Sequence, residues 1–206
     1  EVDREEDDQK DKDVRQKLRE ALFTSEQQKA LHEYIVLFRR VVQQTEKGRR
    51  PRFSVLAVVG NGNGLVGYGE GKHEEGEEAK VMAFKEAYRN MDYVPRFEKR
   101  TLFTPLRTKL GSTEIILRPR PVGFGLAVNP NIHKILTAAG IKDCGGKVWG
   151  SRTPLNVIKG TFRMLLSGNA PLSMGNGIGG PGRKLDKGSG VISKGDVERA
   201  RGRKLV

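Results

Sequence analysis

Short apolar runs follow one another between residues 31 and 100, and their lengths predict strands that precede a single helix. Residues 31–44 are rich in β-branched and aromatic side chains, which favours a strand, or a helix-to-strand passage, over one long helix. Residues 53–59 are almost continuously apolar over the length of a strand, which predicts a central strand covered on both faces. Residues 65–69 predict a further strand.

Turn-forming residues separate these strands. The segment EKGRRPR, residues 46–52, predicts a turn. The Asn-Gly pairs at residues 61–64 predict a tight hairpin, because Asn and Gly tolerate positive φ. Residues 74–91 have helical spacing, with four glutamates at the start, where the helix dipole favours acids. The predicted apolar face of this helix consists of Ala79, Met82, Ala83, Ala87 and Met91. The first unit is therefore predicted as three strands closed by a helix.

The second half of the chain mixes strand and helix patterns again. Strands are predicted over residues 114–117, 123–128 and 143–149, and helices over residues 132–139 and 154–166. Gly140 is expected to end the first helix, and Thr153 and Pro154 to begin the second as N-cap and first helical residue. The predicted apolar stripe of the last helix consists of Leu155, Ile158, Phe162 and Leu165. The predicted fold class is α+β, with two small domains.

Composition divides the chain into four parts. Residues 1–30 carry more acidic than basic side chains and few apolar ones, so we expect a disordered extension or a solvated helix. Pro95 and the charges around it predict a domain boundary close to Lys99. The predicted parts are an acidic N-terminal extension over 1–30, a first domain over 31–100, a second domain over 101–170 and a basic glycine-rich tail over 171–206.

The charge balance indicates the class of partner. The chain has 38 Lys and Arg against 25 Asp and Glu, a net charge of +13, and a pI near 10.0, which favours a polyanion such as nucleic acid. An acidic membrane surface is the less favoured alternative, because no stretch reaches the roughly 18 apolar residues of a membrane span. The basic residues are also dispersed instead of lining one amphipathic helix.

Cysteine and histidine offer little chemistry in this sequence. Cys144 is the only cysteine, and the three histidines are scattered without the spacing of metal ligands. No pair of nucleophile and base stands out either, so we expect no enzyme activity, cofactor, metal or small-molecule substrate. The chain begins without Met and without an apolar signal segment, so we expect any targeting peptide to have been removed or left out.

A glycine-rich segment follows the central strand. The spacing Gly62-x-Gly64-x-x-Gly67 matches a dinucleotide-binding fingerprint, but the segment continues as a strand where that fold requires a helix. Gly71-Lys72 resembles a phosphate-binding loop but lacks its first glycine and its Ser or Thr. Two interpretations remain: turn formation with close packing, or close approach of an RNA backbone beside Lys72. Both concern Gly60, Gly62, Gly64, Gly67, Gly69 and Gly71.

Clustered cations are the candidate RNA contacts. Arginine binds phosphate through two parallel hydrogen bonds, so runs of arginine in a basic body favour phosphate contact over simple solubility. The first cluster is placed around the predicted loop and consists of Arg39, Arg40, Lys47, Arg49, Arg50 and Arg52. Arg118 and Arg120 form another. Aromatic residues are sparse between the cations, which favours folded RNA over base stacking on a single strand.

Longer segments resemble one known family. RRPRFSVLAVVGNGNGLVGYGEGK at 49–72, Arg89-Asn90-Met91, and AGIKDCGGKVWGSRTPLNVIKGTF at 139–162 resemble the universal small-subunit ribosomal protein five, in order and over both domains. The resemblance implies a first domain like a double-stranded-RNA-binding fold and a second α+β domain. It also implies a structural role on small-subunit ribosomal RNA, near the decoding region and the path by which messenger RNA enters. The implied neighbours are ribosomal proteins four and eight, and the implied roles are assembly and translational fidelity.

The resemblance also assigns individual positions. The RNA-facing loop of the family falls on residues 47–52, and its GSxNP segment corresponds to residues 150–154, where Thr153 replaces Asn. Ser151 and Arg152 thereby join the predicted ribosomal-RNA contacts. A family GxGxxAGG element departs here at Asn129 and Pro130, so no close backbone contact is carried over to that spot. Residues 92–105, GFGL at 123–126 and the long extensions resemble mitochondrial members, and the expected branch among them is the fungal one. We therefore expect a ribosome of the mitochondrial matrix, with a bacterial or other organellar ribosome as the alternative.

Overall fold

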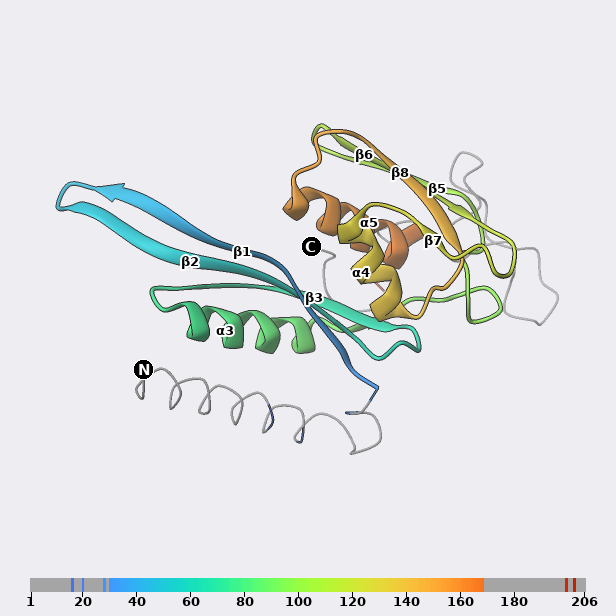
Figure 1. Ribbon diagram of the computed structural model, residues 1–206, viewed down its shortest axis with the longest axis horizontal. Coiled ribbons are helices and arrows are strands. Elements are labelled where there is room, and N and C mark those ends of the chain that lie inside the picture. The colour runs from blue at the N-terminus through green and yellow to red at the C-terminus, as the bar shows by residue number, and fades with distance from the viewer. Residues whose placement is uncertain are drawn as a thin grey trace. The chain divides into compact units, whose positions relative to one another are not determined.

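Two sheets, each packed against helices, organise the chain (Figure 1). This computed structural model describes residues 30–168 together with Gln16, Glu20, Gln28, Arg199 and Gly202. The predicted extension 1–30 and tail 171–206 therefore lie almost entirely outside the described residues. The internal contacts divide the chain into two units after Asp92, and the boundary predicted near Lys99 lies further along the chain.

The first unit contains a four-stranded sheet and one helix. Its elements are β1 (His32–Thr45), β2 (Gly48–Gly60), β3 (Leu65–His73), α3 (Gly76–Arg89) and β4 (Asp92–Tyr93). The strands lie in the order β1-β2-β3-β4, and β1, β2 and β3 pair antiparallel. The predicted three strands and helix are confirmed. The two-residue β4 at the sheet edge is an addition, because so short a segment carries no periodic signal.

Two boundaries in this unit differ from the prediction. The predicted turn over residues 46–52 is wrong beyond its first residues, because β2 already begins at Gly48 and the arginines after it belong to the strand. The residues of this segment favour a turn locally, but the hydrogen bonds supplied by the partner strand β1 override that preference. Strand β3 extends to His73 and α3 starts only at Gly76, so no helix follows Gly67 as a dinucleotide site requires.

Alanines of α3 pack directly on glycines of β3. A Cβ atom added at Gly69 would lie 2.2 Å from the carbonyl oxygen of Ala83, and one at Gly71 would lie 2.0 Å from that of Ala79. A Cβ atom at Gly67 would meet the Ala87 carbonyl at 2.4 Å. Two residues along a strand and four along a helix advance by similar distances, about 6 to 7 Å. The glycine and alanine repeats therefore match, and the helix backbone touches the strand.

The apolar face of α3 differs from the predicted one at three helical positions. Ala79, Ala83 and Ala87 are buried as expected, and the core cluster adds Phe84 and Tyr88 from α3. Met82 is 47% exposed, so its predicted place in the core is wrong. Ala83 and Ala87 are each followed by a buried aromatic residue, Phe84 and Tyr88. The apolar stripe of α3 therefore includes the Phe84 side of the alanines and not the Met82 side.

The second unit is also an α+β arrangement. Its elements are β5 (Leu106–Leu110), β6 (Thr113–Pro119), β7 (Leu126–Ala127), α4 (Pro130–Ala139), β8 (Cys144–Gly150) and α5 (Pro154–Gly168). The sheet order is β5-β6-β8-β7, with β7 parallel to β8 and the other pairs antiparallel. The α+β prediction is confirmed. Strand β5 was not predicted, because its alternation of apolar and polar residues is short and contains charged residues.

Gly140 ends α4 and Pro154 begins α5 as predicted, whereas α4 begins at Pro130, two residues before its predicted start. The side chain of Asn129 accepts a hydrogen bond from the backbone N–H of Asn131 at 3.0 Å, and Gly140 ends α4 with φ of 77°. Before α5, the Thr153 hydroxyl is 2.9 Å from the Ser151 hydroxyl. The predicted strand over 123–128 is wrong except at Leu126–Ala127, because Gly123 and Gly125 have positive φ and form a loop instead.

Candidate nucleic-acid interface

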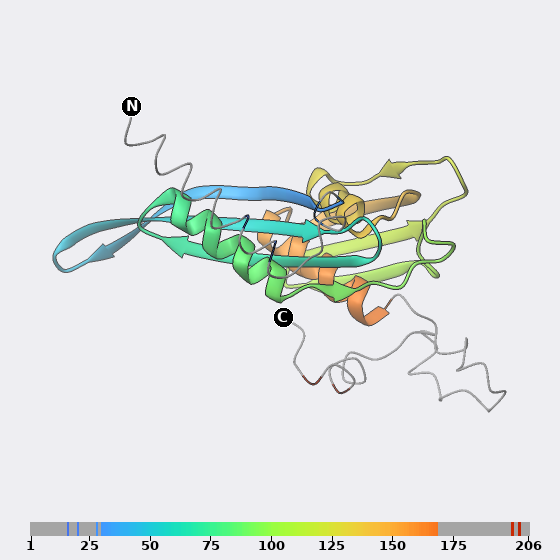
Figure 2. The same cartoon turned by 90° about the horizontal axis from the view of Figure 1, so that it is seen from below.

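Strands β1 and β2 extend past the rest of their sheet as a two-stranded ribbon. Strand β3 pairs with β2 only from Phe53 to Gly60, whereas β1 continues to pair with β2 as far as Gly48. Figures 1 and 2 show this ribbon projecting beyond α3 and β3. The two residues at its tip are Glu46 and Lys47, and the Thr45 hydroxyl donates a hydrogen bond of 2.8 Å to the Gly48 carbonyl. We call residues 39–52 the basic ribbon.

The basic ribbon carries the first predicted cluster of cations. Arg39 and Arg40 lie on β1, Arg49, Arg50 and Arg52 lie on β2, and Lys47 lies in the turn. All six side chains belong to exposed residues. Glu46 is the one acid among residues 39–52. The sequence analysis placed these cations around a predicted loop, whereas in the structure two paired strands hold most of them at the fixed spacing of strand residues.

The register divides these cations between two faces. Core residues Phe53 and Val55 point toward α3, so by alternation Arg49 lies on the α3 side, together with Arg40 opposite Phe53. The remaining arginines, Arg39, Arg50 and Arg52, lie on the other side. Arg39 pairs with Ser54, and Ser54 pairs with Lys72 on β3, so Lys72 joins this second face. The face turned away from α3 therefore carries Arg39, Arg50, Arg52 and Lys72.

Acidic residues lie close to only part of this surface. Arg52 makes an exposed ion pair of 3.7 Å with Glu74, just before α3. Glu77 and Glu78 occupy the first turn of α3, and Glu78 lies 2.8 Å from the His73 imidazole. An RNA phosphate would be repelled at the start of α3 and attracted along the ribbon. The ribbon is thus the favoured place for a polyanion in this unit.

The glycines of the hairpin serve turns and packing. Gly62 and Gly64 have φ of 64° and 100°, and the Asn61 side chain accepts hydrogen bonds from the backbone N–H groups of Asn63 and Leu65 at 2.8 and 3.0 Å. Gly60 ends β2 and is buried. Gly67, Gly69 and Gly71 have the α3 backbone where a side chain would stand. That side of β3 is therefore closed to an RNA backbone, and the packing interpretation accounts for these three glycines.

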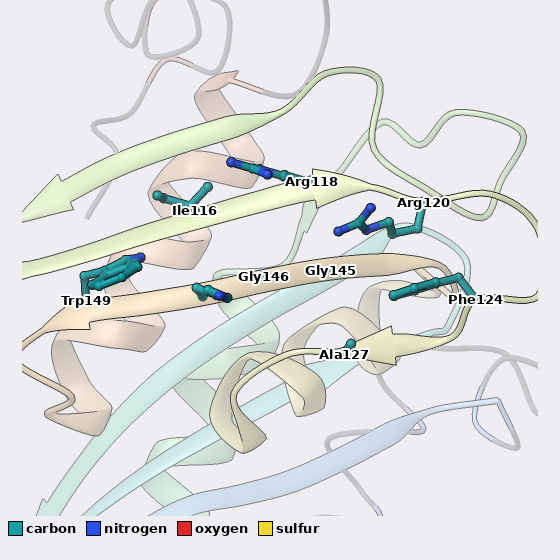
Figure 3. Close-up of a pocket in the computed structure, with 9 residues that line it drawn as sticks. Ile116, Arg118, Arg120, Phe124, Ala127, Gly145, Gly146 and Trp149 are labelled. Carbon is teal, nitrogen blue, oxygen red and sulfur yellow. The ribbon is translucent and has the colours of Figure 1, made fainter.

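The second sheet presents a mixed basic and aromatic face. Arg118 on β6 pairs with Gly145 on β8, and Ile116 pairs with Lys147, so these side chains share the face that Arg120 and Trp149 also line. Figure 3 shows Ile116 and Arg118 on one side of the sheet, with Trp149 at one end and Arg120 and Phe124 at the other. Between them lies a hollow of about 340 Å³.

Ser151 and Arg152 lie beside the same face. The backbone N–H of Ser151 donates a hydrogen bond of 3.1 Å to the Ser112 carbonyl, which fixes the start of the loop before α5. Arg152 is exposed and lines a second hollow of about 280 Å³, together with Asn129 and Val148. Lys147 and Trp149 line both hollows. The structure therefore groups the predicted Arg118, Arg120 and Arg152 around two residues that sequence reasoning passed over.

Lys147, Trp149 and Phe124 are the functional candidates that were missed. The alternation of Lys147, Val148 and Trp149 within a predicted strand already placed the lysine and the tryptophan on one face. The sequence therefore contained this signal, but it did not show which strand pairs with this one and brings Arg118 alongside. Phe124 lies in a loop between two positive-φ glycines, where sequence periodicity gives no orientation.

Other chemistry is limited in the described part of the chain. Burial raises the pKa of Cys144 to about 11, which keeps the thiol protonated and unreactive near neutral pH. The described residues include no group of three or more His, Cys, Asp or Glu suited to a metal ion. No helix among them is long and apolar enough to cross a membrane.

Two family models match this chain, one in each unit. Residues 31–95 match the family model for the N-terminal domain of ribosomal protein S5, and residues 108–175 match the model for its C-terminal domain. The chain is 44% identical over 133 residues to the small ribosomal subunit protein uS5m of Schizosaccharomyces pombe, covering 65% of this chain and 34% of that protein.

Two further relatives widen the comparison. The protein of the same name from Neurospora crassa is 40% identical over 144 residues, which cover 70% of this chain and 30% of that protein. The small ribosomal subunit protein uS5 of Mesomycoplasma hyopneumoniae is 36% identical over 134 residues, covering 65% and 62%. The chain thus spans about a third of the length of the two fungal relatives.

Proposed function

The chain belongs to the ribosomal protein S5 family, and we propose from this that it is a non-enzymatic structural protein of a mitochondrial small ribosomal subunit. The observation that carries the proposal is the ordered match of both S5 domain models over residues 31–95 and 108–175. The basic ribbon supports it physically, because six cations on a projecting pair of strands suit the backbone of a folded RNA.

The proposed ribosomal-RNA contacts lie on both units. In the first unit they are Arg39, Arg40, Lys47, Arg49, Arg50, Arg52 and Lys72. In the second unit they are Arg118, Arg120, Ser151 and Arg152. We assign the phosphate backbone to these side chains because guanidinium and ammonium groups at exposed positions neutralise phosphates without reading sequence.

The proposed location follows the resemblance found in the sequence. We place the protein beside the decoding region and the path by which messenger RNA enters, next to ribosomal proteins four and eight. Roles in assembly and translational fidelity belong to this proposal. We propose the mitochondrial matrix as its compartment, because the two fungal relatives carry the mitochondrial name uS5m. A bacterial or other organellar ribosome is the alternative.

Co-sedimentation tests the proposed role directly. The tagged full chain, expressed in a fungal host, is expected to migrate with small-subunit particles in a sucrose gradient and to remain there at moderate salt. Cross-linking within those particles is expected to join residues 47–52 to ribosomal RNA. Recovery of the protein only in fractions of free protein would contradict the proposal.

A free module that binds any double-stranded RNA is the second candidate. The two glutamates in the first turn of α3, Glu77 and Glu78, oppose it, because they would repel phosphate at the helix N-terminus. The full chain is therefore expected to bind generic RNA duplexes weakly. Tight binding to such duplexes, lost when cations of α3 are replaced and retained without the ribbon arginines, would favour the free module instead.

A further inference from the structure

Trp149 is the only tryptophan of the chain, and it lies exposed on the second sheet. Its side chain is 57% exposed although it is a large apolar group on a regular strand, β8. It lines both hollows on this face, so ligand groups can reach it from two sides. Glu114, directly opposite on β6, forms an ion pair with Arg107. The indole is thus an open aromatic surface beside a neutralised carboxylate.

The larger hollow has the size and lining of a site for a flat ring. Its volume of about 340 Å³ lies within the range of small-molecule sites. Gly145 and Gly146 contribute no side chains to it, while Ile116, Phe124 and Trp149 supply apolar surface. Arg118, Arg120 and Lys147 complete the lining, and no Asp or Glu belongs to it. A ligand that combines a flat apolar part with negative charge fits this composition.

The loop that bears Arg120 and Phe124 is fixed in place by hydrogen bonds. The guanidinium of Arg120 lies over the Phe124 ring, 5.0 Å from its centroid. The backbone N–H of Gly125 donates to the buried Asp143 carboxylate at 3.0 Å, and the Gly125 carbonyl accepts from the Cys144 N–H at 3.0 Å. The Arg100 guanidinium donates to the Arg120 carbonyl at 3.1 Å. These bonds hold the aromatic end of the hollow before any ligand arrives.

We propose that this face binds an unpaired RNA nucleotide, with its base stacked on Trp149 and its phosphates held by Arg118, Arg120 and Lys147. This proposal rests on the proposed function and specifies how the second unit engages RNA. A base offers an aromatic face and its backbone offers negative charge, and both match the lining of the hollow. A base within a duplex is stacked between its neighbours, so the nucleotide must come from a loop, a bulge or an end.

Fluorescence of the single tryptophan tests this stacking in the full chain. A short oligouridylate is expected to quench Trp149 fluorescence saturably, because a stacked base contacts the indole. A base-free oligomer with the same number of phosphates is expected to cause no quenching. Trp149→Ala is expected to weaken oligouridylate binding about tenfold, measured by fluorescence anisotropy of labelled RNA, and Trp149→Phe about threefold or less.

Tyr93→Ala serves as the matched control, because Tyr93 is another aromatic residue, 62% exposed, that lines neither hollow. It is expected to leave oligouridylate affinity unchanged. Equal quenching by the base-free oligomer, or unchanged affinity of Trp149→Ala, would overturn the stacking site. A cross-link from position 149 to protein instead of RNA in purified small subunits would overturn it too. Each of these outcomes leaves co-sedimentation intact, so failure of the stacking site is distinguishable from failure of the ribosomal role.

Discussion

Glycines of the first sheet face a helix, whereas Gly145 of the second sheet faces away from its helices. In the first sheet, Gly67, Gly69 and Gly71 admit the backbone of α3 to within contact of β3. In the second sheet, Gly145 pairs with Arg118 and leaves a hollow beneath Arg120 and Trp149. A glycine in a strand therefore does not reveal its role by itself. The group that faces it decides whether the missing side chain permits close packing or leaves room for a ligand.

The cations of the two units differ in the same way. On the basic ribbon they stand on exposed strands, where they can neutralise phosphates, and the aromatic residue beside them, Phe38, is already stacked on Phe53. On the second sheet they surround Trp149 and Phe124. The ribbon should therefore bind RNA with strong salt dependence, and the second sheet should add contact with a base.

Gly69→Ala is expected to have the largest effect of any change considered. The new Cβ atom would lie 2.2 Å from the Ala83 carbonyl oxygen and 2.3 Å from the Ala87 backbone nitrogen. Neither backbone atom can rotate away, so α3 must separate from β3. We expect a loss of more than about 3 kcal/mol in the free energy of unfolding, or no folded first unit, in urea denaturation followed by circular dichroism. A variant with wild-type stability would contradict the packing of α3 on β3.

Asp143→Ala is expected to destabilise the second unit strongly. The carboxylate is buried, accepts from the Gly125 N–H at 3.0 Å and lies 3.5 Å from the Arg100 guanidinium. Its removal leaves the partly buried Gly125 N–H without its acceptor and takes one acceptor from the Arg100 guanidinium, which keeps Glu98 and the Arg120 carbonyl, at a cost of about 2 to 3 kcal/mol. Asp143→Asn keeps an oxygen for Gly125 and should lose less. Equal stability of the Ala and Asn variants in urea denaturation would show that this hydrogen bond does not fix the loop.

Replacing ribbon arginines should weaken RNA binding without affecting the fold. The double variant Arg39→Gln with Arg50→Gln changes the face shared with Lys72, and Arg40→Gln with Arg49→Gln changes the α3 side. We expect about a tenfold loss in affinity for small-subunit RNA from the first pair and less from the second, because more cations share the first face. The slope of log affinity against log salt should become shallower in both.

Lys85→Gln with Arg89→Gln provides the matched control for the ribbon variants. It removes two exposed cations from α3 of the same unit, so the net charge changes equally. Its effect on affinity and on the salt slope is expected to be much smaller. Losses equal to those of the ribbon pairs would mean that overall charge attracts the RNA and that the ribbon has no special role.

Gly145→Ala should have the smallest effect on stability and therefore sharpens the contrast with Gly69→Ala. Its Cβ atom would lie 2.9 Å from the Arg120 Nε, which belongs to a flexible side chain. We expect a change within about 0.5 kcal/mol in urea denaturation. Because the methyl group narrows the hollow, oligouridylate affinity should fall a fewfold. A stability loss as large as that of Gly69→Ala would show that this glycine also serves packing.

Local sequence alone determined much of this protein. The Asn-Gly turn at 61–64, the αL end of α4 at Gly140 and the strand between residues 53 and 59 depend on intrinsic φ preferences and on apolar runs. The positions of the cations, the α+β class and the family were likewise readable. These features follow from neighbouring residues, so no partner segment was needed to infer them.

Only the tertiary structure decided what those residues face. The arginines after Gly48 lie in a ribbon and not in a loop because β1 pairs with them. The β3 glycines let α3 pack closely because three alanines of the helix have the same spacing as the glycines. Trp149 joined Arg118 and Arg120 through the register of β8 on β6. Pairing between distant segments sets these relations, and a pattern of period two or 3.6 reports which residues share a face but not what lies opposite it.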